Sequence, residues 1–514
     1  MKEIVTFKIH PSIGIARLGN SLNEFFIGPE IPGKYPKPKG GYKDSQRKVK
    51  RQAARFRIFG YDKKRKVVKE ITAKEAIIKW TVHIANKKSA WKRFDGLEKN
   101  TALRNATISR NQLEIDPGSR SLSSVNAVAK FDTGKFMGKK VPLGEIHTDS
   151  KGCLLVLGGF GKSVSPNHNP ILHFANNDDW HDDISDGPVN ATITLKGSNK
   201  TFNASGSWVI CAPPDFAPSI ANAITLYDTL LQVAVDKLGY KLPRKPSFVN
   251  DIRPILERAN NMRWVCNLVE MHMASQQEAE GNSHDGNADD HNNNHDEGLP
   301  PHHSLDAAIS FPIPAEARKA IFKKLRNPDS PFDQATEGSD MPMIHNDFDN
   351  DVNESLTRIQ YDVMKKWMKG KFIDDRNKII SIQKTITPEG LDRAALESCA
   401  GAAFYPGIES SWMIRDTYKF AEAFRLDQIN LLAGDITKQM AVPWQADFYD
   451  CKQQDELAWW PAQRPDQVFP SRDEKQVPWT RDHAGNYELM TKYWHKLGFV
   501  IKKGNSYIES ERNP

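Results

Sequence analysis

An aspartate and a cysteine four residues apart are the part of this sequence best suited to chemistry. Asp447 and Cys451 lie in the segment MAVPWQADFYDC, residues 440–451. If this segment is helical, residues i and i+4 share a face and the carboxylate can reach the thiol. Only a thiolate is nucleophilic, so a neighbouring base activates the cysteine. The surrounding apolar residues should desolvate the carboxylate and raise its pKa, which makes it a stronger base. The alternative for Cys451 is an inert buried thiol.

Tryptophans are concentrated around this cysteine. Trp444, Trp459, Trp460, Trp479 and Trp494 all lie within fifty residues of it. In a cysteine protease the expected partner of the thiol is a histidine, whereas aromatic rings dominate here. Proximity in the sequence does not decide which ring would meet the thiol, because every tryptophan can also serve as a packing residue.

Motifs along almost the whole chain resemble one enzyme family. They are IHPSIGIARLGNS at 9–21, FFIGPE at 25–30, VPLGEIHTDSKGCLLVLGGFG at 141–161, NNDDWHDDISDGPV at 176–189, GSWVICAPPDFAP at 206–218, FYPGIESSWMIRD at 404–416, GDITKQMAVPWQ at 434–445 and WPAQRPDQV at 460–468. With them the chain resembles the cysteine tryptophylquinone-dependent amino-acid oxidases, which include L-lysine epsilon-oxidase and glycine oxidase-like enzymes.

The resemblance implies a cofactor made from the chain itself. In that family a cysteine and a tryptophan are cross-linked and oxidised to cysteine tryptophylquinone, and the tryptophan lies well downstream of the cysteine. This favours Trp494 as the partner of Cys451, with Trp479 or Trp460 as alternatives. Asp447 would act as the catalytic base. The implied reaction is oxidative deamination of an amino acid by dioxygen, with release of ammonia and hydrogen peroxide.

The resemblance also implies partners and a substrate pocket. A flavoprotein maturation partner is expected, since the indole must be oxygenated before the cross-link forms. Cys399, Tyr405 and Trp412 are expected near the substrate channel, although Cys399 can equally be a core thiol. His483 could transfer protons, but a packing or surface role is the alternative. A homo-oligomer is also expected.

Two other functions stay open at this point. One is a cysteine-dependent hydrolase or transferase that uses unmodified Cys451 with His483. The other is a non-catalytic β-rich binding module. The chain lacks a P-loop, a G-x-S-x-G motif and a G-x-G-x-x-G motif after a strand, which disfavours nucleotide-cofactor enzymes and serine hydrolases. The acidic run at 178–187 does not match a calcium loop, and Asp is also typical of capped turns. No metal site is predicted.

Composition narrows the class of protein further. The chain has 514 residues, and Lys+Arg 71 against Asp+Glu 64 gives a net charge of +7. The basic residues at 34–69 alternate with aromatic and aliphatic ones, which is typical of strands, so no nucleic-acid partner is expected. Five cysteines without a C-x-x-C pair predict neither a disulfide framework nor a zinc ribbon. Without a membrane span or a secretory signal, we expect cytoplasmic synthesis, with export by a non-classical route left open.

The pattern of residues predicts an α+β protein. Its helices and strands must hold Asp447, Cys451 and the tryptophans in place. Residues 1–218 are expected to form a β-rich N-terminal domain, since short β-branched runs alternate with Gly, Pro, Asn and Asp. One helix is predicted inside it at 72–88, because Thr72 and Glu75 form a capping-box pattern. A helical middle is expected at 219–395, with a disordered polar insertion at 275–298. Residues 396–514 should form a mixed C-terminal domain that carries the cofactor.

Overall fold

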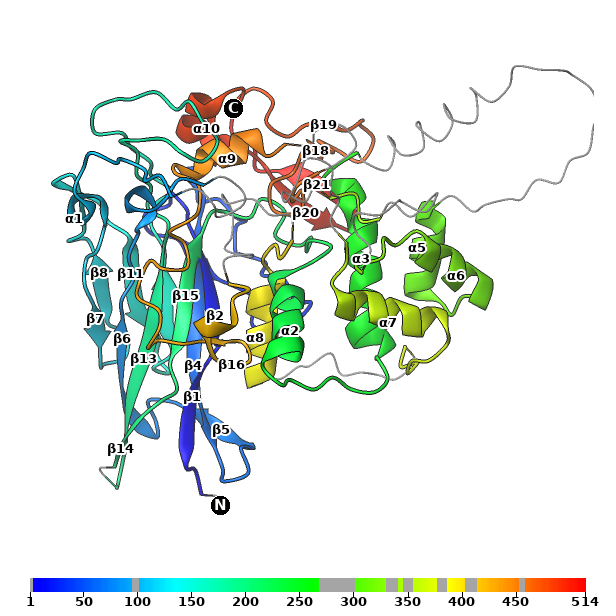
Figure 1. Cartoon of the computed structure of the whole chain (residues 1–514), viewed down its shortest axis with the longest axis horizontal. Helices are drawn as coiled ribbons and strands as arrows, with labels where there is room; N and C mark the ends of the chain where they lie inside the picture. Colours follow the sequence, from blue (N-terminus) through cyan, green and yellow to red (C-terminus); the bar gives the residue numbers. More distant parts are fainter. Residues whose placement is uncertain are drawn as a thin grey trace, which may run out of the picture.

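The computed structural model describes residues 3–94, 101–198, 200–267, 301–329, 341–344, 355–376, 386–402, 414–452 and 458–514. Its architecture is α+β, as predicted (Figure 1). The predicted polar insertion at 275–298 and the residues Tyr405 and Trp412 lie outside these ranges.

A sheet of 13 strands forms the body of the N-terminal part. Its main path runs β7-β6-β13-β15-β2-β4-β12-β11-β8, with β1, β3 and β5 also paired to β4 and β14 paired to β13. The strands are β1 (Thr6–His10), β2 (Ile13–Arg17), β3 (Phe25–Ile27), β4 (Arg51–Tyr61), β5 (Val67–Ile71), β6 (Ala76–Val82), β7 (Arg120–Leu122), β8 (Val128–Phe131), β11 (Gly144–Thr148), β12 (Leu154–Leu157), β13 (Ser185–Leu195), β14 (Thr201–Asn203) and β15 (Ser207–Ala212).

The helix predicted at 72–88 is wrong. One of the two capping-box hydrogen bonds forms, since the backbone N–H of Thr72 donates to the Glu75 carboxylate; the Thr72 hydroxyl also donates to that carboxylate, and the Glu75 N–H donates to the carbonyl of Thr72. The chain then continues as β6, in which buried and more exposed residues alternate from Ala76 to Val82. Two-residue alternation and β-branched side chains suit a strand, and pairing with β13 and β7 outweighs the local helix signal.

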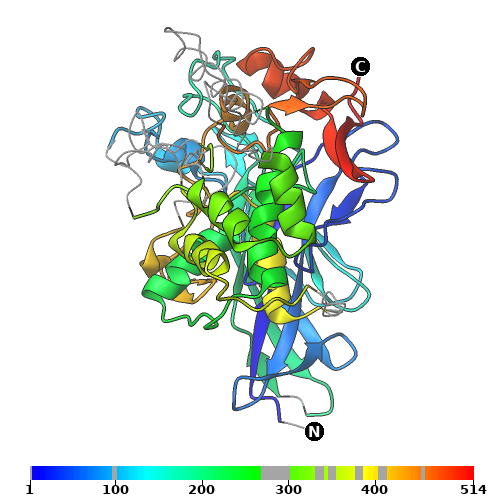
Figure 2. The same cartoon turned by 90° about the vertical axis from the view of Figure 1, so that its right-hand side faces the viewer.

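The helices lie mainly on one side of the sheet (Figures 1 and 2). α2 and α8 cover strands β2 and β15 through a shared apolar core, and α3, α5 and α7 form a second core beside them. The helices are α1 (Arg110–Leu113), α2 (Leu226–Lys237), α3 (Arg253–Asn261), α5 (Pro301–Ser310), α6 (Ala315–Lys323), α7 (Arg358–Met368), α8 (Pro388–Glu397), α9 (Trp444–Asp450) and α10 (Tyr487–Tyr493). A helical middle is therefore present, while the exact domain boundaries stay a prediction.

Helices α9 and α10 lie together at one end of the sheet, opposite the N-terminus (Figure 1). Short strand pairs accompany the C-terminal part. The remaining strands are β9 (Lys135–Phe136), β10 (Lys139–Lys140), β16 (Phe420–Glu422), β17 (Arg425–Leu426), β18 (Gln467–Val468), β19 (Val477–Pro478), β20 (Phe499–Lys503) and β21 (Ser506–Ser510). The backbone N–H of Val500 in β20 donates to the carbonyl of Phe216, which joins the last hairpin to the segment that follows the sheet.

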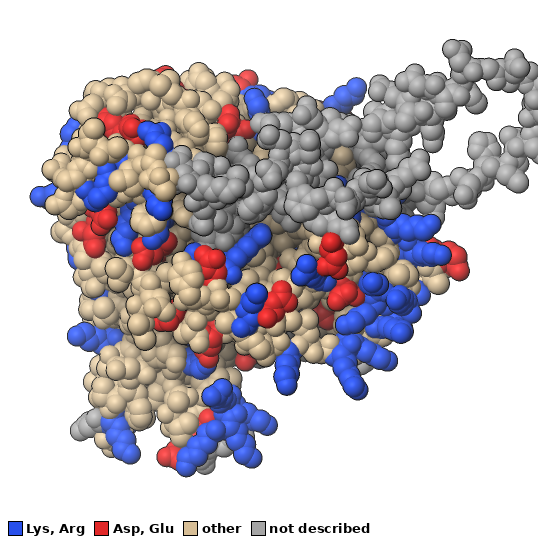
Figure 3. All heavy atoms as spheres, viewed as in Figure 1, with Lys and Arg blue, Asp and Glu red and all other residues tan. Residues whose placement is uncertain are grey.

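Most of the arginines in β4 are neutralised within the fold. Arg51 pairs with Glu145 at 2.7 Å, and Arg57 pairs with Glu30 at 2.8 Å. On the face drawn in Figure 3, most of the described surface is uncharged; blue and red side chains are intermixed in the middle, and blue ones gather at the lower right and at the lower end. Among the described residues, no helix combines the length and apolar character needed to cross a bilayer.

Candidate active site

Helix α9 brings the predicted thiol and carboxylate together. Cys451 Sγ lies 3.3 Å from Asp447 Oδ1, and the backbone N–H of Cys451 donates to the carbonyl of Asp447 at 2.8 Å. Both residues are buried. The spacing of four residues therefore places the two groups on one face, at the C-terminal end of a short helix.

The Cys451 thiol is protonated at neutral pH in this arrangement. Burial raises its pKa well above the ordinary value of 9.0, the negative charge of Asp447 raises it further, and the guanidinium of Arg464 opposes both effects. A reactive thiolate therefore requires proton transfer to a base within hydrogen-bond reach. The structure places Asp447 at that distance.

Arg464 is a buried cation near this pair that sequence reasoning missed. Its Nε donates to the carbonyl of Phe448 at 2.6 Å, and its Nη1 donates to Asp466 at 2.8 Å. The last carbonyls of a helix have no partner inside it, so the guanidinium satisfies one of them at the end of α9. The motif WPAQRPDQV contains this arginine, but its contact with α9 depends on the tertiary fold.

The acidic run at 178–187 fixes the start of α9. The backbone N–H of Trp444, the first residue of the helix, donates to Asp182 Oδ2 at 3.0 Å. Pro443 precedes the helix and offers no side-chain cap, so Asp182 supplies one from a distant segment. Asp182 also forms a fully buried ion pair with Lys88. The sequence indicated capping aspartates here, but not which helix they would cap.

The candidate tryptophans meet in one core cluster with Cys451. This cluster contains Trp444, Trp459, Trp460, Trp479 and Trp494. Trp479 is held as a packing anchor, since its Nε1 donates to the carbonyl of Gly498 at 2.9 Å and its ring lies 4.8 Å from that of Phe216. Trp460 packs with its ring 5.8 Å from the ring of Phe448.

Trp494 directly follows α10, the helix that packs on α9. Its ring is 3% exposed and lies edge-on to Trp444, with 5.5 Å between the ring centroids. A Cβ atom at Gly161 would lie 2.3 Å from Trp494 Cζ2, so the bare backbone of Gly161 forms a cradle for the six-membered ring. A thiol, a neighbouring carboxylate and a cradled indole are the parts that a cysteine tryptophylquinone requires, and the residues present fit it.

Of the proposed pocket residues, the structure describes Cys399 and His483. Cys399 is buried in the apolar core that α2 and α8 share and borders a small hollow together with Asn222 and Gln463, and its role stays a prediction. His483 is partly buried and makes a hydrogen bond of 2.8 Å with the carbonyl of Asn513. The acceptor for the Cys451 thiol is a carboxylate, whereas the hydrolase alternative needs a histidine in that place.

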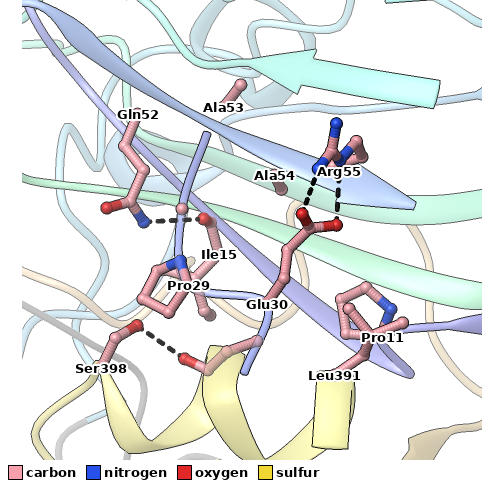
Figure 4. Close-up of a pocket in the computed structure, with 12 residues that line it drawn as sticks. Pro11, Ile15, Pro29, Glu30, Gln52, Ala53, Ala54, Arg55, Leu391 and Ser398 are labelled. Atoms are coloured by element: carbon pink, nitrogen blue, oxygen red, sulfur yellow. Dashed lines mark hydrogen bonds and ion pairs between the residues drawn. The ribbon is translucent and has the colours of Figure 1, made fainter. Parts of the chain in front are cut away.

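A separate hollow lies between β4 and α8 (Figure 4). Its polar groups are already paired: Glu30 with Arg55, Gln52 with the carbonyl of Ile15, and Ser398 with a carbonyl of α8. Burial would raise the pKa of Glu30, but hydrogen bonds from Arg55 and a neighbouring arginine hold that pKa below its ordinary value. These groups stabilise the junction of sheet and helix.

Comparison with known proteins gives matches over most of the chain. The family model for the L-lysine epsilon oxidase N-terminal region matches residues 10–211, and the model for the L-lysine epsilon oxidase C-terminal domain matches residues 340–479. L-lysine 6-oxidase of Marinomonas mediterranea is 27% identical over 536 residues, which covers 87% of this chain and 71% of that protein.

Solved structures share the fold. The epsilon-lysine oxidase from Marinomonas mediterranea superposes with a TM-score of 0.78 at 23% identity, covering 99% of this chain and 95% of that one. The Schiff base intermediate of the L-Lys epsilon-oxidase from the same organism with L-Lys has a TM-score of 0.77 at 23% identity, with the same coverage. The two family models together span most of the chain, and the chain belongs to the L-lysine epsilon-oxidase family.

Proposed function

We propose that this amino-acid oxidase deaminates its substrate with a cysteine tryptophylquinone formed from Cys451 and Trp494. The observation that carries the proposal is the hydrogen bond between Cys451 Sγ and Asp447 inside a cluster of buried tryptophans. Family membership supports it, because the resemblance of the motifs implies this cofactor. The cradle at Gly161 favours Trp494 over Trp479, whose indole N–H is already engaged by Gly498.

Asp447 has two roles in this proposal. During maturation it accepts the proton of Cys451, because the buried thiol does not ionise by itself at neutral pH. During turnover it accepts the proton from the substrate carbon that bears the amine. When formed, the quinone supplies an acceptor for two electrons, which dioxygen then receives to give hydrogen peroxide. Ammonia and an aldehyde or keto acid are the other products.

The surroundings of Asp447 support the role of a base. Arg464 is fully buried and interacts electrostatically with both Asp447 and Cys451. Apolar residues such as Trp444 and Phe448 exclude water from the same space. The guanidinium favours the ionised form of a nearby carboxylate, and only the ionised form can accept a proton.

The substrate is an amino acid, and L-lysine is the first candidate because the relative from Marinomonas mediterranea is named for it. Release of peroxide and ammonia from a panel of amino acids would identify the substrate. Lysine blocked at one amine or the other would then show which amine is oxidised. We further propose a flavoprotein maturation partner, a homo-oligomeric enzyme and synthesis in the cytoplasm.

Two alanine variants test the assignment of the thiol. Cys451→Ala should abolish the visible absorbance of the quinone and the oxidase activity while leaving the fold intact, since one sulfur is a modest packing loss. Cys266→Ala is the matched control, because Cys266 is also buried and its Sγ also lies 3.3 Å from an acceptor four residues earlier, the carbonyl of Met262. Normal turnover in Cys451→Ala would refute the proposal.

A further inference from the structure

We propose that residues 158–163, called here the glycine loop, are a template that fixes where the Trp494 ring is modified. Gly161 contacts the ring edge that receives oxygen, and Asp183 and Gln445 hold the loop in place. The inference rests on the proposed function, because it concerns the formation of the quinone. It assigns positioning roles to residues that do not themselves react.

Gly161 packs closely against part of the Trp494 ring. A Cβ atom at Gly161 would lie 2.3 Å from Cζ2, 2.9 Å from Cη2 and 3.0 Å from Cε2 of Trp494. Real Cβ atoms do not approach other atoms so closely, so the ring can occupy this place only because residue 161 lacks a side chain. Gly161 also has a φ of +70°, which L residues rarely adopt.

The position of Gly161 limits which ring carbons can react with sulfur. Four carbons of the six-membered ring of tryptophan carry hydrogen: Cε3, Cζ3, Cη2 and Cζ2. Cη2 and Cζ2 are among the three atoms nearest to the Gly161 Cβ position, so we infer that the sulfur joins the opposite part of the ring, at Cε3 or Cζ3. An ortho-quinone carries its two oxygens on adjacent carbons that still bear hydrogen. If the sulfur is on Cε3, the possible pairs are Cζ3 with Cη2 or Cη2 with Cζ2; if it is on Cζ3, the pair is Cη2 with Cζ2. In either case Cη2 gains an oxygen. The edge beside Gly161 is therefore the edge that gains oxygen.

The atoms of this modification balance with dioxygen as the oxidant. The ring loses three hydrogens and the thiol loses one, while the ring gains two oxygens and a carbon–sulfur bond. Two dioxygen molecules supply the two oxygens on the ring. Their other two oxygen atoms leave with the four hydrogens as two water molecules.

Asp183 fixes the glycine loop by accepting two of its backbone N–H groups. Its Oδ2 accepts the backbone N–H of Phe160 at 2.6 Å and that of Lys162 at 3.2 Å, the two residues that flank Gly161. Asp183 is buried, and a Cβ atom at Gly159 would lie 2.4 Å from its Oδ2. The loop therefore depends on one carboxylate and on a glycine that admits it.

Gln445 joins the glycine loop to the helix of the thiol. Its Nε2 donates to the carbonyl of Gly161 at 3.0 Å, and its Oε1 accepts the hydroxyl of Ser163 at 2.6 Å. Gln445 is fully buried and belongs to α9, the helix that carries Asp447 and ends at Cys451. The ring edge and the thiol are thus positioned by one hydrogen-bonded frame, which fixes the ring relative to the sulfur.

Gly161→Ala tests this frame in the full chain, produced together with the flavoprotein that the family implies. The added methyl group should displace the ring from its place, so that its carbons no longer align with the Cys451 sulfur, because the loop is held by Asp183 and Gln445. We expect a folded protein that has lost the visible absorbance and keeps the unmodified mass. Gly33→Ala is the matched control, since Gly33 also has a φ of +70° but has nothing within 4 Å of its Cβ position. This control should gain two oxygens and lose four hydrogens.

Ser163→Ala provides a second test if Gly161→Ala does not fold. Ser163 is half-buried, and its loss removes the donor to Gln445 Oε1 without adding volume, while Gln445 Nε2 keeps its bond to Gly161. We expect slower appearance of the quinone absorbance in a folded protein, with a small decrease in melting temperature because a buried acceptor loses its donor. If Gly161→Ala is fully modified, or if Ser163→Ala forms the quinone at the wild-type rate, the role of the glycine loop is refuted while the proposed function stands. An unmodified wild-type chain in the same experiment would overturn the proposed function as well.

Discussion

At Cys451, the thiol depends on its neighbour for reactivity. Burial keeps the thiol protonated, since its pKa lies well above 9.0. Asp447 at 3.3 Å offers the route for the proton, and the indole of Trp494 lies in the same core cluster. An isolated buried cysteine would be inert. The pair Asp447 and Cys451 is therefore the smallest unit of the site that can react.

Two substitutions of Asp447 should distinguish the role of its shape from the role of its negative charge. Asp447→Asn keeps the shape but cannot accept a proton, so we expect a folded precursor without the cross-link. Asp447→Glu keeps the base and displaces it, and a shift of about 1 Å can cost about a hundredfold in rate. Some mature but slow enzyme should result, as measured by intact mass and by peroxide release. Normal maturation and turnover of Asp447→Asn would show that the base lies elsewhere.

Helix α9 is positioned by residues from outside it at both ends. Asp182 accepts the N–H of Trp444 at its start, and Arg464 donates to the carbonyl of Phe448 near its end. A helix of seven residues has little stability of its own, so tertiary contacts must hold it. This is the reason why motifs far apart in the sequence converge on one site.

Removal of the Asp182 side chain should destabilise the fold strongly. Asp182→Ala leaves the fully buried ammonium of Lys88 without its ion-pair partner and the start of α9 without its cap. Breaking a buried pair in this way costs about 3–5 kcal/mol. Glu3→Ala is the control, because it removes an exposed pair with Lys63 and should cost below about 1 kcal/mol. Denaturant unfolding of both variants measures the difference, and equal losses would contradict this account.

Asp183 should make stability depend on pH. Burial is the main cause that raises its pKa from 3.8 to about 7, against a hydrogen bond from Lys162 that lowers it. The folded state therefore holds the proton more tightly, and the fold loses stability as pH rises between about 4 and 7. Asp183→Asn lacks this loss, so its relative stability should increase over that range, by at most about 4 kcal/mol. The melting temperatures of the wild-type chain and of Asp183→Asn, measured across these pH values, provide the test. If both melting temperatures change with pH in the same way, the prediction is wrong.

The sequence predicts local contacts better than distant ones. The spacing of Asp447 and Cys451 predicts their contact, because i and i+4 are neighbours in a helix of any fold. The helix at 72–88 is wrong, because a capping box is a local signal and the pairing of β6 with β13 depends on a strand more than a hundred residues later. The contact of Gly161 with Trp494 could not be predicted for the same reason, since glycine in a loop is common.

The whole molecule supplies a rigid support for one small site. The sheet contributes the glycine loop after β12 and the acidic run before β13, and the C-terminal part contributes α9 and α10 (Figure 1). These parts share one apolar cluster that includes Ile184, Phe216 and Trp494. Because the site needs both ends of the chain, we expect the thiol and the indole to meet only after the chain has folded.

Maturation should therefore follow folding and need a second protein. Chain produced alone should fold, with the melting behaviour of a native protein, and stay colourless, because a thiol and an indole do not cross-link without oxygenation of the ring. Chain produced with the flavoprotein partner should show visible absorbance and oxidase activity. Visible absorbance spectra and peroxide assays on the two preparations provide the comparison. A coloured, active enzyme made without any partner would contradict this prediction.

The most direct test of the central claim is peptide mapping of the mature chain by mass spectrometry. The account predicts one cross-linked fragment that contains both Cys451 and Trp494, with two oxygens gained and four hydrogens lost relative to the separate peptides. A cross-link from Cys451 to Trp479 or Trp460 would move the partner to another ring of the same cluster. Recovery of separate, unmodified Cys451 and Trp494 peptides from active enzyme would contradict the claim.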